Sequence, residues 1–242
     1  MEQYEQIIAR ELAAWKVRML KKPGLMAKLS KRTQDKLNAA IPEKVHNTIT
    51  AIIKQMIRGV LFGAKYTTSR PPENATLRER ELIIQGKIKF YRSTAAIEGG
   101  VTGAGGIFLG LADFPMLLAL KLKLLYEIAT VYGFDLNDYK ERIYLLHVFE
   151  LAFSGKAHSR EVFLKIENWE QYAKELPEDI HQFDWRKFQQ EYRDYLDIAK
   201  MAQLLPIIGA PVGFVVNYKL VKKLGETAMN AYRMRYLKSG SG

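Results

Sequence analysis

Residues 99–120, GGVTGAGGIFLGLADFPMLLAL, form one of two long stretches of this sequence that have no amphipathic pattern. The stretch has 22 residues and a single charged side chain, Asp113. The second, residues 201–218 (MAQLLPIIGAPVGFVVNY), has 18 residues and no charge. A membrane span needs about 20 apolar residues, and glycine, proline and polar residues interrupt both stretches. We therefore expect buried helices or reversibly inserting elements, and no stable transmembrane helix.

The glycines of these stretches recur four residues apart, in the pairs Gly99/Gly103, Gly106/Gly110 and Gly209/Gly213. This spacing places both members of a pair on one helix face, where small residues let another backbone approach closely. We expect these faces to serve helix packing or membrane contact. The same glycines do not predict a phosphate-binding loop, because Ile107 and Phe108 stand where such a loop needs lysine and then Ser or Thr. No cofactor is predicted.

The rest of the chain shows mainly helical periodicity. Apolar residues at spacings of three and four predict helices over 4–19 and 42–60, and a last helix over 211–237. Thr76 and Glu79 form a capping-box pattern, which follows a turn-rich loop and predicts a helix start. Asn137 or Asp138 could cap a further helix that ends near Gly155. No convincing strand alternation is present, so we predict a compact all-α fold with the two apolar segments at its centre.

The composition narrows the function. The chain has 242 residues, 48% of them hydrophobic, and no cysteine, which excludes disulfides, thiolate metal sites and thiol nucleophiles. The acidic, polar start predicts no secretory signal. The net charge of +11 is uneven: residues 1–92 hold 19 basic and 8 acidic side chains, and residues 201–242 hold 6 and 1. Such ends would attract polyanions, either anionic lipid headgroups or nucleic acid.

Polar residues in or near the apolar segments are the candidates for a functional role. Asp113 would be costly in an apolar run unless it is paired or caps a helix, and we interpret it first as the cap of a helix that begins at Phe114 and Pro115. Asp135 is interpreted first as a turn or cap residue. Asn217, in an uncharged helix, is expected to form an internal hydrogen bond or to line a polar contact.

Motifs for catalysis or metal binding are weak. His147/Glu150 and His158/Glu161 are two His-x-x-Glu pairs, but bundle metal sites use the reverse order together with further glutamates. Neither a His-Glu-x-x-His zinc motif nor a Gly-x-Ser-x-Gly nucleophile elbow is present. We predict neither catalytic nor metal-ligating residues.

Short motifs in and around the two apolar stretches match a known pattern. They are GGVTGAGG (99–106), LADFP (111–115), YEIA (126–129), YGFD (132–135), LPIIGA (205–210), Gly213, NY (217–218) and RMRY (233–236). Together they resemble the EcsC family. The resemblance implies a helical, membrane-peripheral bacterial protein. Because the family is named for a protein encoded beside an ABC transporter, it also implies a transporter or another membrane protein as a partner.

These observations predict one domain over residues 1–242. Within it we expect basic amphipathic helices over 1–66, a loop over 67–76, a family-like helical core over 77–237 and a flexible tail over 238–242.

We interpret the chain as a non-enzymatic cytoplasmic protein, peripheral at the inner face of the membrane and accessory to a membrane transporter or a secretion process. Basic residues near the end of the chain are expected to contact the anionic surface: Lys219, Lys222, Lys223, Arg233 and Arg235. One alternative is a soluble, hydrolase-like enzyme with a site near Asp113, Tyr132 and Asp135. A second is a basic nucleic-acid-binding module, which the charge allows but no motif supports.

Overall fold

The computed structural model describes residues 3–21, 43–62, 68, 70–103, 106–195 and 210–239. Every element of these residues is helical, which confirms the all-α prediction. The helices are α1 (Gln3–Leu20), α3 (Glu43–Phe62), α4 (Leu77–Gly103), α5 (Gly106–Tyr132), α6 (Tyr139–Phe153), α7 (Lys156–Glu167), α8 (Trp169–Glu175), the short 3-10 helix η1 (Ile180–Gln182), α9 (Trp185–Tyr195) and α11 (Ala210–Ser239).

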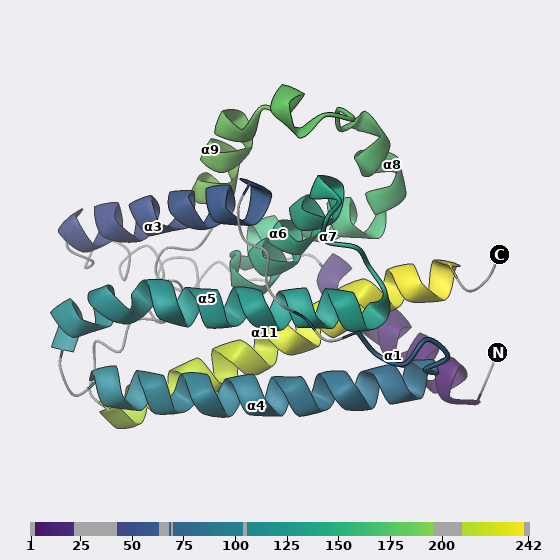
Figure 1. The fold of residues 1–242 in the computed structure, drawn as a ribbon, viewed down its shortest axis with the longest axis horizontal. Coiled ribbons are helices and arrows are strands. Elements are labelled where there is room, and N and C mark those ends of the chain that lie inside the picture. Colours follow the sequence, from purple (N-terminus) through teal and green to yellow (C-terminus); the bar gives the residue numbers. More distant parts are fainter. Residues whose placement is uncertain are drawn as a thin grey trace.

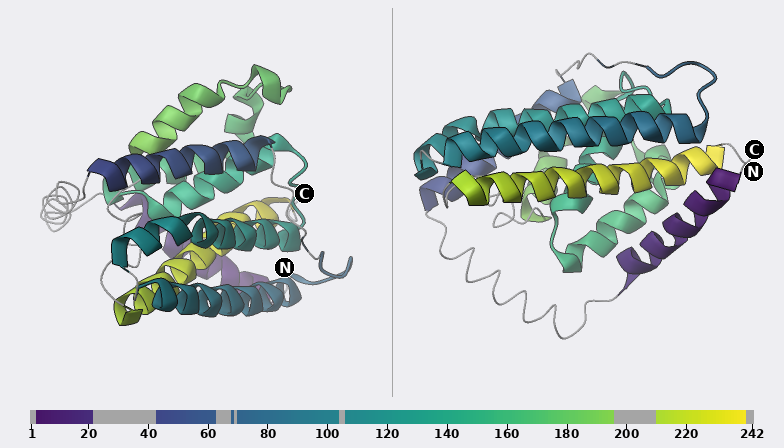
Figure 2. Two further views of the ribbon diagram at one scale, coloured as in Figure 1. Left: turned by 60° about the vertical axis from the view of Figure 1, so that its left-hand side comes forward. Right: turned by 90° about the horizontal axis from the view of Figure 1, so that it is seen from below.

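Three long helices form the main body. Helices α4 and α5 lie antiparallel, and α11 lies beside both (Figures 1 and 2). The contact between α4 and α11 is close at Gly225, where an added Cβ would lie 2.6 Å from Cγ1 of Ile88. In the view of Figure 1, α3 and α6–α9 lie above α5 and close the core from that side. Both apolar segments thus contribute helices to the main body.

The ends of these helices follow local sequence signals. Thr76 and Glu79 form the predicted capping box, because the backbone N–H of Thr76 donates to Oε2 of Glu79 at 2.8 Å and the N–H of Glu79 donates to Oγ1 of Thr76 at 3.3 Å. Helix α5 ends at Tyr132, and the next residue, Gly133, has a φ of +96°, the left-handed conformation that glycine tolerates. Asp138 caps α6 by accepting from the N–H of Lys140.

The interpretation of Asp113 as a helix cap is wrong. Helix α5 begins at Gly106 and continues through Pro115, so Asp113 lies inside the helix and does not cap its start. Proline at an interior position removes one backbone hydrogen bond, but it does not end α5 here. The half-buried Asp113 side chain has neither an ion pair nor a side-chain hydrogen bond among the described residues.

A buried ion pair joins the main body to α1. Glu81 of α4 is fully buried, and its two carboxylate oxygens accept from Nε and Nη2 of Arg233 of α11 at 2.6 and 2.5 Å. Tyr4 of α1 donates to the same carboxylate at 2.7 Å, and Tyr132 of α5 donates to it at 3.1 Å. One carboxylate thereby links α1, α4, α5 and α11. Because it has charged and neutral donors, its burial is compensated.

Candidate functional site

One end of the main body carries exposed apolar side chains. The C-terminal end of α4 and the N-terminal ends of α5 and α11 meet there, opposite the chain termini (Figures 1 and 2). Near this end Ile97 is 61% exposed, Met116 45%, Phe214 43% and Val215 46%. We call these four residues the apolar end. Exposed large apolar side chains on neighbouring helices are a feature of surfaces that contact a partner or a membrane.

Next to the apolar end, aromatic and basic side chains follow along α11. The rings of Phe214 and Tyr218 are stacked with centroids 6.5 Å apart, and the guanidinium of Arg92 lies 4.7 Å from the Tyr218 centroid. Lys219 and Lys222 are exposed in the next turns. The order along the helix is therefore apolar, aromatic and then cationic. Membrane-interface segments have the same order, because aromatic rings and long cationic chains lie at headgroup level.

A buried lysine lies beneath this region. Lys121 of α5 is fully buried, and its Nζ donates to Oδ1 of Asn217 at 3.3 Å and to the carbonyl of Leu117 at 3.2 Å. Burial lowers the pKa of Lys121 from 10.5 to about 7. Asn217 is buried as well, so the internal hydrogen bond expected for it is present.

The glycine pairs lie around the same end, but their packing stays a prediction. Gly99 and Gly103 lie in α4, Gly106 and Gly110 lie in α5, and Gly213 lies in α11, although the surroundings of these positions are not among the described features. Gly209 lies outside the described residues. The close helix approach that the structure does show is at Gly225, which sequence reasoning missed. A lone glycine inside a helical pattern was the available signal.

The predicted surface cations differ in their surroundings. Lys219 and Lys222 are exposed, and Nζ of Lys222 lies 3.7 Å from Oε1 of the equally exposed Glu226. Nζ of Lys223 donates to the carbonyl of Ala152 at 2.5 Å. Arg233 forms the buried pair with Glu81. Arg235 binds both carboxylate oxygens of Glu141 at 2.6 Å, and its guanidinium also lies 4.1 Å from the ring centroid of Phe134. Both arginines thus have internal partners, and only Lys219 and Lys222 are used below as surface contacts.

Asp113, Tyr132 and Asp135 do not form one site. Asp113 and Tyr132 lie on the same straight helix, 19 residues or about 28 Å apart. Tyr132 is buried on the Glu81 carboxylate, and Asp135 accepts from the backbone N–H of Asn137 at 3.0 Å in a local turn. The first interpretation of Asp135 as a turn residue is thus confirmed.

The two His-x-x-Glu pairs converge on one buried carboxylate. Nδ1 of His147 lies 2.8 Å from Oε2 of Glu150, and Nε2 of His158 lies 2.9 Å from its Oε1. Burial opposes ionisation of Glu150, but the hydrogen bonds from the two histidines outweigh it and lower its pKa to about 2. Glu161 contacts the outer nitrogen of His158. Within the described part of the chain, no group of His, Asp or Glu has metal-site geometry, and this cluster joins α6 to α7 by hydrogen bonds instead.

Sequence reasoning singled out the two apolar segments but missed the individual residues that the structure exposes. Ile97 lies off the buried stripe of α4, and an apolar residue off such a stripe was the signal for it. Lys121 was missed although it is flanked by apolar residues on both sides. None of the described helices is both long enough and apolar enough to cross a membrane.

Comparisons with known proteins give a consistent family. The model of the EcsC protein family matches residues 6–237. The chain is similar to Protein EcsC of Bacillus subtilis (strain 168), with 44% identity over 98% of each chain. It is also similar to the Uncharacterized protein YdbA of the same organism, with 27% identity over 93% of this chain and 90% of the relative. No solved structure matches.

Proposed function

The chain belongs to the EcsC family, and on that premise we propose that it is a peripheral membrane protein that docks its apolar end on an anionic lipid surface. The observation that carries the proposal is the exposure of Ile97, Met116, Phe214 and Val215 in the parts of three long helices that are nearest to this end of the main body. The lipid surface on which it docks would be the inner face of the cytoplasmic membrane. No catalytic step is part of the proposal.

The energies are sufficient for reversible binding. Each of the four side chains is about half exposed, so its burial in lipid would contribute about 1 kcal/mol. Each cation near an anionic surface adds about 1 kcal/mol, and Lys219 and Lys222 are placed for this. Two half-buried carboxylates, Glu98 and Asp113, also lie near this end, so we expect apolar burial to dominate over charge.

Vesicle flotation tests the proposal. We expect the purified protein to float with vesicles of mixed neutral and anionic lipid, more strongly as the anionic fraction rises, and to be only partly released by high salt. Phe214→Asp with Val215→Asp should reduce the floated fraction about tenfold, because two charges would have to enter the lipid. Ile7→Asp with Val17→Asp is the matched control, since it adds the same charges to exposed apolar positions of α1.

The proposal fails if the wild-type protein does not float on any lipid composition. It also fails if both double variants float as the wild type does, because the apolar end would then not be the contact. A membrane transporter as partner is a separate proposal, which the family resemblance suggests. Vesicles free of other proteins separate the two, because docking on lipid alone requires no protein partner.

A further inference from the structure

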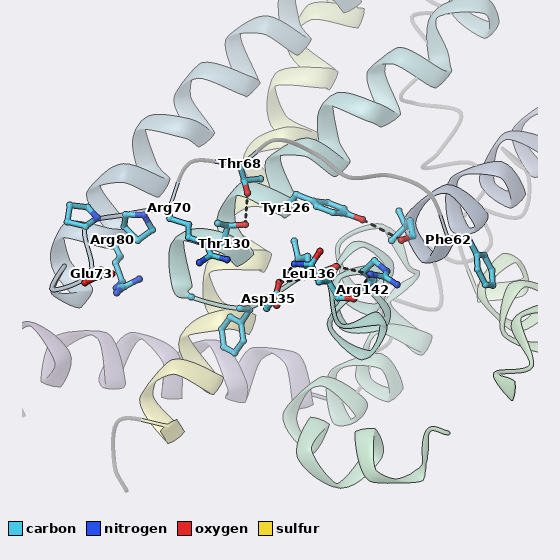
Figure 3. Close-up of a pocket in the computed structure, with 16 residues that line it drawn as sticks. Phe62, Thr68, Arg70, Glu73, Arg80, Tyr126, Thr130, Asp135, Leu136 and Arg142 are labelled. Atoms are coloured by element: carbon cyan, nitrogen blue, oxygen red, sulfur yellow. Dashed lines mark hydrogen bonds between the residues drawn. The ribbon is translucent and has the colours of Figure 1, made fainter. Parts of the chain in front are cut away.

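A cavity of about 760 Å³ lies far from the apolar end, among Thr68 and the loop residues 70–73, the C-terminal end of α5 and the turn before α6 (Figure 3). Its volume is in the range of small-molecule sites. Three arginines line it: Arg70 from the loop, Arg80 from α4 and Arg142 from α6. Neither the sequence motifs nor the proposed membrane contact accounts for this grouping.

Two of the three guanidinium groups are held in place by the backbone. Arg80 donates from Nε to the carbonyl of Ala75 at 3.0 Å and from Nη1 to the carbonyl of Val131 at 2.6 Å. Arg142 donates from Nη1 to the carbonyls of Leu136 and Asn137, both at 2.8 Å. In both residues, Nη2 makes no hydrogen bond within the described part of the chain. These donors are therefore oriented before any ligand arrives, which lowers the entropy lost on binding.

None of the three arginines has a carboxylate partner among the described residues. This distinguishes them from Arg233 and Arg235, each of which binds both oxygens of a glutamate. Contacts with carbonyls near the end of α5 stabilise Arg80. They do not neutralise the three positive charges of the lining, which outnumber its two carboxylates, Glu73 and Asp135, and such an excess of positive charge favours an anion.

The third arginine is presented by a tethered loop. Oγ1 of Thr130 donates to Oγ1 of Thr68 at 3.0 Å, which fixes the start of the loop against α5. Arg70, two residues later, is exposed and lies between Arg80 and Arg142 in the view of Figure 3. Arg70 thus adds a third positive charge to the lining of the cavity.

We propose that this cavity binds the phosphate monoester group of a small molecule. Guanidinium groups match phosphate oxygens in pairs, and a phosphate dianion brings more negative charge to this cationic lining than a single carboxylate would. The aromatic rings of Tyr126 and Phe134 also line the cavity and offer contacts to an apolar or aromatic body of the ligand. Asp135 and Glu73 line it as well, and both lower the affinity for anions.

The phosphate could belong to a free metabolite or to a lipid headgroup. The cavity lies at Thr130 of α5, 14 residues or about 21 Å along the helix from Met116 of the apolar end. A lipid phosphate could reach it only if the protein docked differently from the proposed orientation. The proposal is therefore independent of membrane docking.

Calorimetric titration with phenyl phosphate tests the site. We expect the wild type to bind phenyl phosphate and to bind neutral phenol far more weakly. Arg70→Glu should weaken phenyl phosphate binding about tenfold or more, whereas Arg10→Glu, an identical change at an exposed position of α1, should leave it unchanged. Asp135→Asn should strengthen binding about threefold, because it removes one like charge while an amide oxygen can still accept from Asn137.

The proposal is overturned if phenyl phosphate does not bind at millimolar concentration, or if Arg70→Glu and Arg10→Glu bind it alike. The Asp135→Asn variant guards against loss through misfolding, since its predicted change is a gain. Competition by vesicles containing phosphatidic acid would assign the phosphate to a lipid headgroup. Binding of phenyl phosphate without competition by these vesicles would assign the phosphate to a free metabolite.

Discussion

The two halves of α11 use the same residue types in opposite ways. In the C-terminal half, Arg233 and Arg235 are bound by glutamates of α4 and α6, and Tyr232 is buried against other aromatic rings. In the N-terminal half, Phe214 and Val215 are exposed and Lys219 faces the solvent. The C-terminal half holds the fold together. The N-terminal half, which we call the presenting half, carries exposed side chains.

This difference shows why the net charge of +11 does not by itself identify a partner. Part of the positive charge is internal and cannot attract a polyanion. What distinguishes the presenting half is that exposed cations follow exposed apolar side chains along the same helix. The following three changes test the division along α11.

The largest effect is expected at the buried pair of the C-terminal half. Glu81→Ala should destabilise the protein by about 3–5 kcal/mol, because it leaves the Arg233 guanidinium buried without its counter-charge. The double change Glu81→Leu with Arg233→Met should recover much of this loss. Urea unfolding measures both. A single variant as stable as the wild type would mean that this half does not depend on the pair.

A gain in stability is expected when Lys121, which is buried beneath the presenting half, is replaced. Lys121 has a pKa of about 7 in the folded protein and 10.5 as its reference, so between these pH values the unfolded chain binds more protons and stability rises with pH. Below about pH 7 Lys121 is protonated in both the folded and the unfolded state, so the full free-energy cost of burying its charge lowers the stability of the fold. Lys121→Met should remove it and stabilise the protein by about 2–4 kcal/mol at pH 7.

Unfolding of Lys121→Met and wild type at several pH values between 6 and 9 checks this expectation. The difference between the two should shrink as the pH rises above about 7. If the difference in stability between the two proteins stays constant across this pH range, burial of Lys121 carries no proton-linked cost.

The smallest effect is expected between the halves, at Gly225. Gly225→Ala should cost about 1–3 kcal/mol, because the new methyl group would overlap Ile88 of α4. Gly86→Ala is the matched control on α4, where nothing lies within 4 Å, and it should raise stability by up to about 1 kcal/mol. Thermal unfolding compares the two. Equal effects would show that the helices can separate at this point without loss.

Much of the fold could be predicted because its signals are local. The spacing of Ile8, Leu12 and Trp15 indicated the buried face of α1, and all three are buried. The capping box at Thr76 and Glu79 placed the start of α4. Such patterns act within one or two helical turns, so they can be recognised without knowing the tertiary structure. The prediction that Asp113 caps a helix was wrong because proline near the first turn is typical of a helix start, whereas α5 begins seven residues before Asp113, at Gly106.

The candidate sites could be predicted only in part, because they depend on contacts between distant segments. The apolar segments were visible in the sequence, but the exposure of Ile97 depends on which face of α4 is covered by α11. The cavity brings Arg70, Arg80 and Arg142 together from three elements, and no spacing along the chain relates them. Likewise, nothing local distinguishes Arg233 from Lys219 as the cation that has an internal partner.

The Glu81–Arg233 pair also has a consequence for synthesis on the ribosome. The two residues are 152 positions apart, and chains grow at about 5–20 residues per second, so Glu81 waits about 8–30 s for its partner. During that time the face of α4 that α11 will cover stays open, with a carboxylate among apolar side chains. Helix α11 thus emerges after α4 and α5 and completes the main body, and a chain interrupted before residue 233 would leave this face of α4 without its cover.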